Sequence, residues 1–324
     1  MAANIEVASM SSFDAISRRR IVGCGVASLA AFPLAARAGL DPTPRDIAGT
    51  RDAANRLSIP VMIDGRGPFH FVIDTGADRT VLADDIAAAL RLASGSTVSV
   101  QGIARSVDAS TVHVSSLEFG HQNVARLETP VLPRAWLGAD GYLGLDAING
   151  LRVAFDFKRQ SLSVSEPHQL QMFRIVRPDE SVVRAGGNAG RLRSVDCHVD
   201  GIRACAFIDS GAEISVGNRA LLRGLVASDA AYATGETAEL TGVTGGSVSG
   251  RVTRVDRVHV GGLEFSDTGL VIADLQIFDL WDLAERPALF IGMDVLQQFS
   301  RVVVDYGRKE YRFEFASLAV ASLS

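Results

Sequence analysis

The chain has 324 residues, of which 47% are hydrophobic, and a formal net charge of −5 at pH 7. This composition is typical of a globular protein with enough residues for two hydrophobic cores. Its 37 acidic residues outnumber its 32 basic residues, and no run of lysine or arginine forms a basic patch, so we expect no nucleic-acid partner.

The first 38 residues have the pattern of an export signal. Arg18-Arg19-Arg20 precedes an apolar stretch that runs to Ala35, and the small residues of Ala36-Arg37-Ala38 offer a cleavage site. The arginines indicate the twin-arginine route, and a general secretory signal with an arginine-rich start fits the same residues. The stretch is short and contains glycine and proline. We therefore expect an exported protein, periplasmic or secreted, with no stable membrane span once mature.

The body of the chain is predicted to be mainly β. Residues 57–63 and 69–73 form a predicted hairpin around Asp64-Gly65, and residues 195–199 and 203–208 form a second one around Asp200-Gly201. Few helices are expected. They are residues 82–90, residues 218–225 and short turns after Gly144 and Gly292.

Each predicted hairpin leads into the same motif. Phe71-Val72-Ile73-Asp74-Thr75-Gly76-Ala77 recurs as Ala206-Phe207-Ile208-Asp209-Ser210-Gly211-Ala212. A strand that ends in Asp-Thr/Ser-Gly places its carboxylate on a sharp turn, and the glycine permits backbone that a larger residue resists. Two such turns facing each other would bring Asp74 and Asp209 together. Two close carboxylates cannot both ionise at low cost, so they hold one proton between them.

The repetition extends beyond this motif. Residues 112–119 reappear as residues 258–265, and residues 140–148 reappear more loosely as residues 288–296. A strand is predicted after each copy of the second pair, at residues 152–157 and 301–306. The order is kept throughout, and the second copy carries insertions. The sequence therefore predicts two copies of one lobe.

These motifs resemble the signature of aspartic proteases. That signature is Asp-Thr/Ser-Gly-Ala followed later by two hydrophobic residues and a glycine. Gly144-Leu145-Asp146-Ala147-Ile148 and Gly292-Met293-Asp294-Val295-Leu296 look most like the retropepsin-like branch. Members of that branch usually have one lobe and dimerise, whereas this chain carries two lobes, as pepsin does. The resemblance covers residues 53–316.

The resemblance implies two similar closed β-barrel lobes related by a pseudo-two-fold axis, with Asp74 and Asp209 as the catalytic dyad. It also implies that Thr75 and Ser210 join the two turns by hydrogen bonds across the axis. The residues expected to support the active-site turns are Thr75, Gly76, Ala77, Ser210, Gly211, Ala212, Gly144 and Gly292. Candidate flaps are Gln101, Gly102 and Ile103 in the first lobe and Thr241, Gly242 and Val243 in the second. None of the chain's tyrosines lies in the first candidate flap, where pepsin-type enzymes place one, so flap mechanics are not transferred.

The expected organisation has six parts. They are a signal peptide at 1–38, a mature N-terminal segment at 39–52, a first lobe at 53–167, an interlobe connection at 168–189, a second lobe at 190–316 and a C-terminal tail at 317–324.

Other chemistry finds little support in the sequence. No His-x-x-x-His pair or cysteine–histidine cluster has zinc spacing, so we expect no metal and no cofactor. Asp146 and Asp294 are expected to cap the short helices in which they lie.

Cys197 and Cys205 flank Asp200-Gly201, and an exported protein can form disulfides. A two-residue turn would place Cys197 opposite Ala204, which disfavours a bridge, and the sequence leaves the question open.

The resemblance implies an aspartic endopeptidase that hydrolyses peptide bonds of a peptide or protein substrate with a water activated by the two aspartates. One chain contains both halves of the site, so we expect a monomer. The alternative is a catalytically silent protease fold that binds peptides. Both aspartates, both hydroxyl residues and both glycines are present, which favours the enzyme.

Overall fold

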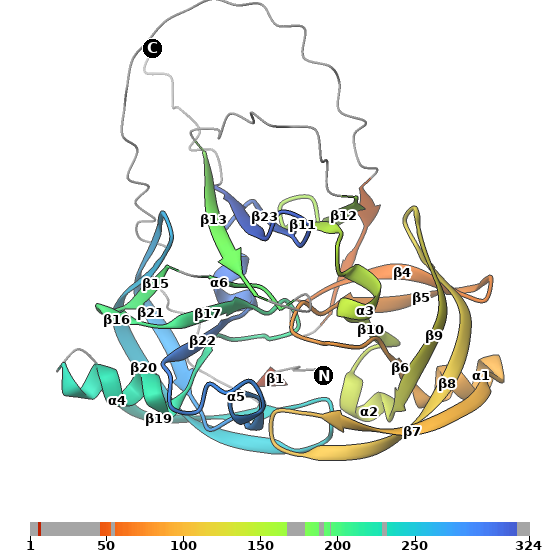
Figure 1. Ribbon diagram of the computed structural model, residues 1–324, viewed down its shortest axis with the longest axis horizontal. Coiled ribbons are helices and arrows are strands. Elements are labelled where there is room, and N and C mark those ends of the chain that lie inside the picture. Colours follow the sequence, from red (N-terminus) through yellow and green to blue (C-terminus); the bar gives the residue numbers. More distant parts are fainter. Residues whose placement is uncertain are drawn as a thin grey trace, which may run out of the picture.

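The computed structural model of the chain describes residues 6–7, 46–52, 56–166, 179–187, 191–194, 196–228 and 232–315. The predicted signal peptide (apart from β1, Glu6–Val7) and the predicted tail lie outside these residues, as do residues 168–178 of the predicted connection. Figure 1 shows two lobes side by side, the first in orange to yellow and the second in green to blue. The predicted mainly β fold is confirmed.

The first lobe is a closed barrel. Its strands are β3 (Thr50–Arg51), β4 (Leu57–Ile63), β5 (Arg66–Ile73), β6 (Val81–Ala83), β7 (Ala93–Gln101), β8 (Ser106–Phe119), β9 (Gln122–Leu132) and β10 (Gly141–Leu143), and its helices are α1 (Asp84–Leu90), α2 (Arg134–Leu137) and α3 (Leu145–Ile148). Six strands pair in the order β4-β5-β10-β6-β9-β8, and β8 pairs with β4 to complete the ring. The short strand β10 runs between β5 and β6, next to the end of the hairpin that carries Asp74.

The second lobe repeats this topology. Its strands are β14 (Arg193–Ser194), β15 (Cys197–Val199), β16 (Ile202–Arg203), β17 (Cys205–Ile208), β18 (Val216–Gly217), β19 (Tyr232–Thr241), β20 (Ser247–Val260), β21 (Leu263–Ile272) and β22 (Ala288–Ile291), and its helices are α4 (Arg219–Ala227), α5 (Gln276–Leu280) and α6 (Met293–Leu296). Strand β22 lies between β17 and β18, as β10 lies between β5 and β6. Strand β15 pairs with β20, which completes the ring as β4 and β8 do in the first lobe.

A sheet shared by both lobes joins them. Its strands are β2 (Ile47–Ala48), β11 (Arg152–Asp156), β12 (Ser161–Ser165), β13 (Glu180–Gly186), β23 (Arg301–Asp305) and β24 (Glu310–Glu314). They pair in the order β13-β24-β23-β11-β12-β2. The two strands predicted after the glycine motifs, β11 and β23, pair antiparallel with Ala154 opposite Val303, so the approximate two-fold axis passes between them. Part of the predicted interlobe connection is thus strand β13, which pairs with β24.

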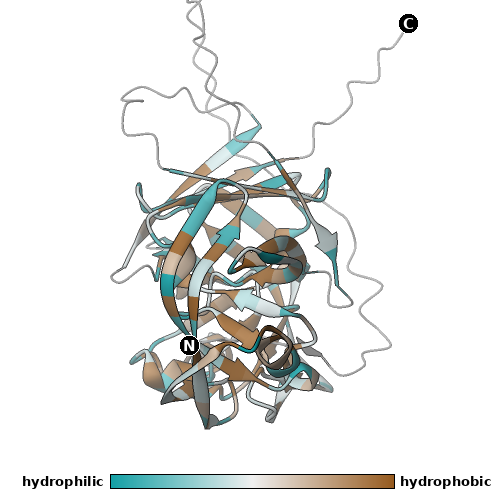
Figure 2. Cartoon of the chain, turned by 90° about the vertical axis from the view of Figure 1, so that its right-hand side faces the viewer, coloured by the Kyte–Doolittle hydropathy of each residue, from teal (hydrophilic) through white to brown (hydrophobic). Residues whose placement is uncertain are grey.

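The long strands show why the sequence repeats. Strands β8 and β20 each have 14 residues, and their burial alternates almost identically. Figure 2 shows brown and teal residues alternating along the long strands. The predicted equivalence of residues 112–119 and 258–265 is wrong, because the second segment crosses the turn at Gly261-Gly262 into β21 while the first lies within β8. Register is set by the buried pattern and the turn geometry, so shared residue letters alone do not fix it.

The helices differ from expectation mainly at their ends. Residues 82 and 83 belong to strand β6, so the first predicted helix begins at Asp84. The second begins after Asn218, whose side chain accepts a hydrogen bond from the Leu221 N–H and so caps the helix. Helices α2 and α5 were not predicted. Among the described residues, no helix has both the length and the apolar character needed to cross a membrane.

Candidate active site

The repeated hairpins deliver Asp74 and Asp209 to neighbouring turns between the lobes. Each aspartate follows a strand, β5 or β17, and its N–H donates to the end of the neighbouring central strand: to Leu143 O in the first lobe and to Ile291 O in the second, both at 3.0 Å. Both aspartates have an exposed fraction of 0%. The two carboxyl groups are close enough for the negative charge of Asp74 to raise the pKa of Asp209. The fold therefore brings the two predicted carboxyl groups together.

The glycines of the motif permit this contact. The N–H of Gly76 donates to Asp74 Oδ1 at 2.8 Å, and the N–H of Gly211 donates to Asp209 Oδ1 at 3.0 Å. A Cβ atom on Gly76 would lie 2.8 Å from Asp209 Oδ2, and one on Gly211 would lie 2.6 Å from Asp74 Cγ. Each turn thus packs its glycine against the carboxyl group of the other turn, and any larger residue would push the two aspartates apart.

The hydroxyl residues join the two turns. Thr75 Oγ1 donates to Ile208 O at 2.8 Å, and Ser210 Oγ donates to Ile73 O at 2.7 Å. The N–H of Ser210 donates to Thr75 Oγ1 at 3.0 Å, and the N–H of Thr75 donates to Ser210 Oγ at 3.2 Å. These reciprocal bonds cross the approximate two-fold axis and hold the carboxyl groups at a fixed separation.

Burial dominates the electrostatics of the pair. It raises the pKa of Asp74 from 3.8 to about 7, although the N–H groups of Gly76 and Ala77 and the charge of Arg56 oppose the shift. Burial and then the negative charge of Asp74 raise the pKa of Asp209 well above its usual range. One shared proton is therefore retained at mildly acidic pH. Neither Oδ2 atom of the two aspartates has a hydrogen-bond partner among the described residues.

Arg56 is a further residue beside the site that no sequence motif predicts. Its side chain is buried, pairs with Asp52 at 2.6 Å and lies over the Tyr142 ring at 5.4 Å. Its charge lowers the pKa of Asp74, so it favours ionisation of that member of the pair. No motif marks Arg56, and only its burial beside the site distinguishes it from the many surface arginines of the chain.

The later glycines lie directly behind the turns. A Cβ atom on Gly144 would lie 2.6 Å from Arg79 O, and one on Gly292 would lie 2.6 Å from Ile214 O. Strands β10 and β22 therefore pass against the segments that leave the aspartate turns. Glycine is the residue that this close backbone approach requires.

The expected helix-capping role is wrong for Asp146, whereas Asp294 Oδ1 does accept the N–H of Val295 in its own helix, at 2.9 Å. The caps of α3 and α6 are Gly144 and Gly292, which have no side-chain cap hydrogen bond. Asp146 instead accepts the N–H and the hydroxyl of Thr80, both at 2.7 Å. Asp294 accepts the N–H of Ser215 at 3.1 Å and its hydroxyl at 2.8 Å. These aspartates attach the short helices to the chain segments that follow the turns.

The two predicted flaps are the tips of the β7–β8 and β19–β20 hairpins, which meet along one side of the molecule (Figure 1). Gln101 and Thr241 end strands β7 and β19. Beyond them, Thr244 Oγ1 donates to Arg105 O at 3.0 Å, and Arg105 Nε donates to Thr244 O at 3.0 Å. The tips are therefore joined across the lobes by reciprocal hydrogen bonds.

Each flap also inserts an apolar residue into the opposite lobe. Ile103 has an exposed fraction of 0% and packs in a second-lobe cluster that contains Phe207 and Phe290. Val243 has an exposed fraction of 1% and packs in a first-lobe cluster that contains Val72 and Tyr142. Gly102 and Gly242 lie against the opposing tip, at Thr244 and Ile103 respectively. With the flaps closed in this way, the carboxyl pair is fully covered.

The predicted register of the second hairpin is correct. His198 pairs with Arg203, and the Ala204 N–H donates to Cys197 O at 3.0 Å, which places Cys197 opposite Ala204. Cys197 and Cys205 are both free thiols. The structure therefore has no bridge between these two residues.

A two-lobed β fold in which each lobe contributes one buried aspartate from an Asp-Thr/Ser-Gly turn defines the aspartic protease class. A family model described as aspartyl protease matches residues 59–147 and 195–295, one match in each lobe. The chain belongs to this aspartyl protease family. A search of curated proteins finds no match to the chain.

Proposed function

We propose that the protein is an exported aspartic endopeptidase. The observation that carries the proposal is the buried Asp74–Asp209 pair, in which burial favours one shared proton and neither Oδ2 atom has a hydrogen-bond partner among the described residues. A water held between the carboxyl groups would be within reach of both, so one group acts as base while the other acts as acid.

In the proposed reaction the ionised carboxylate takes a proton from the water, whose oxygen attacks the scissile carbonyl carbon. The protonated carboxyl group donates to the carbonyl oxygen and stabilises the charge that develops there. The proton held by the first carboxyl group then passes to the amide nitrogen as the C–N bond breaks. The products are a carboxylic acid and an amine, and the pair is left with one proton.

An extended peptide is the substrate form that the flap supports. Strand β19 pairs on one edge with β20, and on its other edge the short strand β1 pairs antiparallel, with Glu6 opposite Thr241 and Val7 opposite Leu240. An edge that accepts a strand from the same chain can accept a substrate strand in the same way. In the proposed exported form, cleavage after residue 38 would remove β1 and leave this edge for the substrate.

The test is cleavage of an unbiased peptide library by the purified mature protein, with and without a statine inhibitor that mimics the transition state. We expect statine-sensitive cleavage that is abolished in Asp74→Asn and in Asp209→Asn, each with an unchanged circular dichroism spectrum. Full cleavage by either variant would contradict the proposed dyad. Peptide binding without cleavage by the wild-type protein would instead support the silent binding module.

A further inference from the structure

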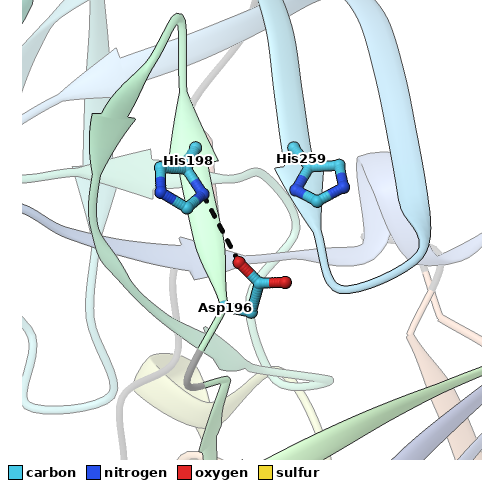
Figure 3. A group of neighbouring side chains, drawn as sticks. All are labelled: Asp196, His198 and His259. Carbon is cyan, nitrogen blue, oxygen red and sulfur yellow. Dashed lines mark ion pairs between the residues drawn. The ribbon is translucent and has the colours of Figure 1, made fainter.

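Three side chains with metal-binding groups gather on the second lobe, outside the aspartate pair. Figure 3 shows Asp196, His198 and His259 with their polar groups turned toward one another. His198 lies on β15 and His259 lies directly opposite on β20. His198 Nδ1 is 3.5 Å from Asp196 Oδ1, and one ligand atom from each residue lies within 4.8 Å of the other two.

The cluster faces the outside of the barrel. His198 stands between the buried residues Cys197 and Val199, and His259 stands between the buried residues Val258 and Val260. Side chains alternate between the two faces of a strand, so both histidines point away from the core. The His198 and Asp196 side chains are 40% and 55% exposed, which leaves them room to rotate.

The spacing suits a zinc ion. Ligand atoms that bind zinc tetrahedrally at about 2.0–2.2 Å lie about 3.3–3.5 Å from one another. The His198–Asp196 pair already has this separation, and the third atom needs to approach by roughly 1 Å, which side-chain rotation supplies. Two imidazoles and one carboxylate are a common zinc ligand set that leaves a fourth position for water.

The residues around the two histidines show which nearby carboxylates are already used by the fold. A surface depression of about 260 Å³ is lined by His198, Asp200, Gly201, Arg257, His259 and Glu264. Asp200 accepts the N–H groups of Asp256 and Arg257 at 3.1 and 2.7 Å, so its carboxylate is already used in the turn. Glu264 pairs in register with His259 and adds negative charge that offsets the charge of Arg257.

The first lobe lacks this cluster. Strands β8 and β20 correspond from Ser106 and Ser247 onward, so Glu118 takes the place of His259. Met62 pairs with Glu118 as His198 pairs with His259. The first barrel therefore closes between β4 and β8 without a histidine pair. The histidine cluster is a feature of the second lobe, and closure of a barrel does not require it.

We propose that Asp196, His198 and His259 form a zinc-binding site. Bound zinc would connect β15 to β20, the strand pair that completes the second barrel, and would stabilise the folded lobe by mass action. The proposal departs from the expectation of no metal, which rested on ligand spacing along the chain. His198 and His259 are far apart in sequence and become neighbours only through strand pairing. The proposal is independent of the protease activity.

The experiment is a calorimetric titration with zinc chloride near neutral pH. It uses the full chain, which carries no histidine tag and is first stripped of metal with a chelator. We expect one zinc ion per chain and a zinc-dependent rise in Tm. His198→Gln and His259→Gln should each weaken zinc binding by about tenfold or more, since even loss of a supporting residue costs that much. Asp196→Asn, in an exposed residue, should weaken it in the same direction.

Matched controls separate this site from other binding. His113→Gln changes an exposed histidine on β8 and should leave the zinc affinity unchanged. Cys205→Ser should also leave it unchanged, which excludes a contribution from this thiol. Magnesium should not compete, because it prefers oxygen ligands. Absence of saturable zinc binding to the wild-type chain, or wild-type affinity in both histidine variants, would overturn the proposal.

Discussion

At the scale of single residues, two alanines set the chemical surroundings of the aspartate pair. A threonine or serine at the position after Asp-Thr/Ser-Gly would carry a hydroxyl that can donate to the carboxylate. Here the positions are Ala77 and Ala212, which are fully buried and donate only through their backbone N–H groups. Burial therefore outweighs hydrogen bonding, and the pKa of Asp74 rises to about 7.

The first prediction concerns the pH dependence of cleavage. The reaction needs one protonated and one ionised carboxyl group, and the raised pKa values preserve the shared proton toward neutral pH. We expect an optimum of kcat/KM at roughly pH 5–7. Ala77→Thr and Ala212→Thr should move the profile toward acid, because the added hydroxyl favours the ionised form. A wild-type optimum near pH 2–3, or no acidic shift in folded threonine variants, would contradict this explanation.

The second prediction concerns stability. The pKa of Asp74 is about 7 in the folded protein, whereas an aspartate in the unfolded chain has its ordinary pKa of 3.8. Between these two pH values the folded state therefore binds more protons than the unfolded state. Stability contributed by this proton is present at low pH and is lost as pH rises through the folded pKa. We expect the Tm of the double variant Asp74→Asn/Asp209→Asn to fall less than the Tm of the wild type when the pH rises from 4 to 7. Parallel pH dependence of Tm in the two proteins would show that the pair does not contribute.

At the scale of elements, the flaps decide access to the pair. Each hairpin tip inserts an apolar residue, Ile103 or Val243, into the opposite lobe, and Arg105 and Thr244 exchange hydrogen bonds between the tips. Asp74 and Asp209 are completely covered in this arrangement. We therefore expect a substrate to reach them only when the tips separate.

The third prediction tests this separation with a cross-link. A Cβ atom on Gly246 would lie 2.9 Å from Ala104 Cβ, close to the spacing that a disulfide spans after a small adjustment. Oxidised Ala104→Cys/Gly246→Cys should lose nearly all peptide cleavage, and a reductant should restore it. The two single variants, treated in the same way, are the controls. Full activity of the oxidised double variant would show that the substrate enters without separation of the flaps.

Local patterns in the sequence predicted the hairpins and the turns, because each depends on a few consecutive residues. The motif around Asp74 and Asp209 and the register around Asp200-Gly201 are of this kind. Features that depend on pairing between distant segments were missed. They include strand β13, the correspondence of β8 with β20, and the meeting of His198 with His259. The buried charge of Arg56 also depends on tertiary packing and has no local signature.

At the scale of the whole molecule, the two lobes are joined by a common hydrophobic cluster and a shared sheet. One hydrophobic cluster contains residues of both lobes, from Leu57 to Phe313, and the shared sheet pairs β11 with β23 across the axis. Thr75 and Ser210 add hydrogen bonds between the lobes. The contacts that hold the two lobes together are therefore formed within one chain.

The fourth prediction follows from this covalent connection. Because Asp74 and Asp209 belong to the same chain and the shared sheet holds the lobes together, we expect a site that does not depend on association between chains. We expect the cleavage rate per chain to stay constant on dilution, with a monomer in sedimentation analysis at the same concentrations. In a site assembled from two chains, the rate per chain would fall as dimers dissociate. Restored activity on mixing Asp74→Asn with Asp209→Asn would show that aspartates from different chains can meet, and would contradict the single-chain site.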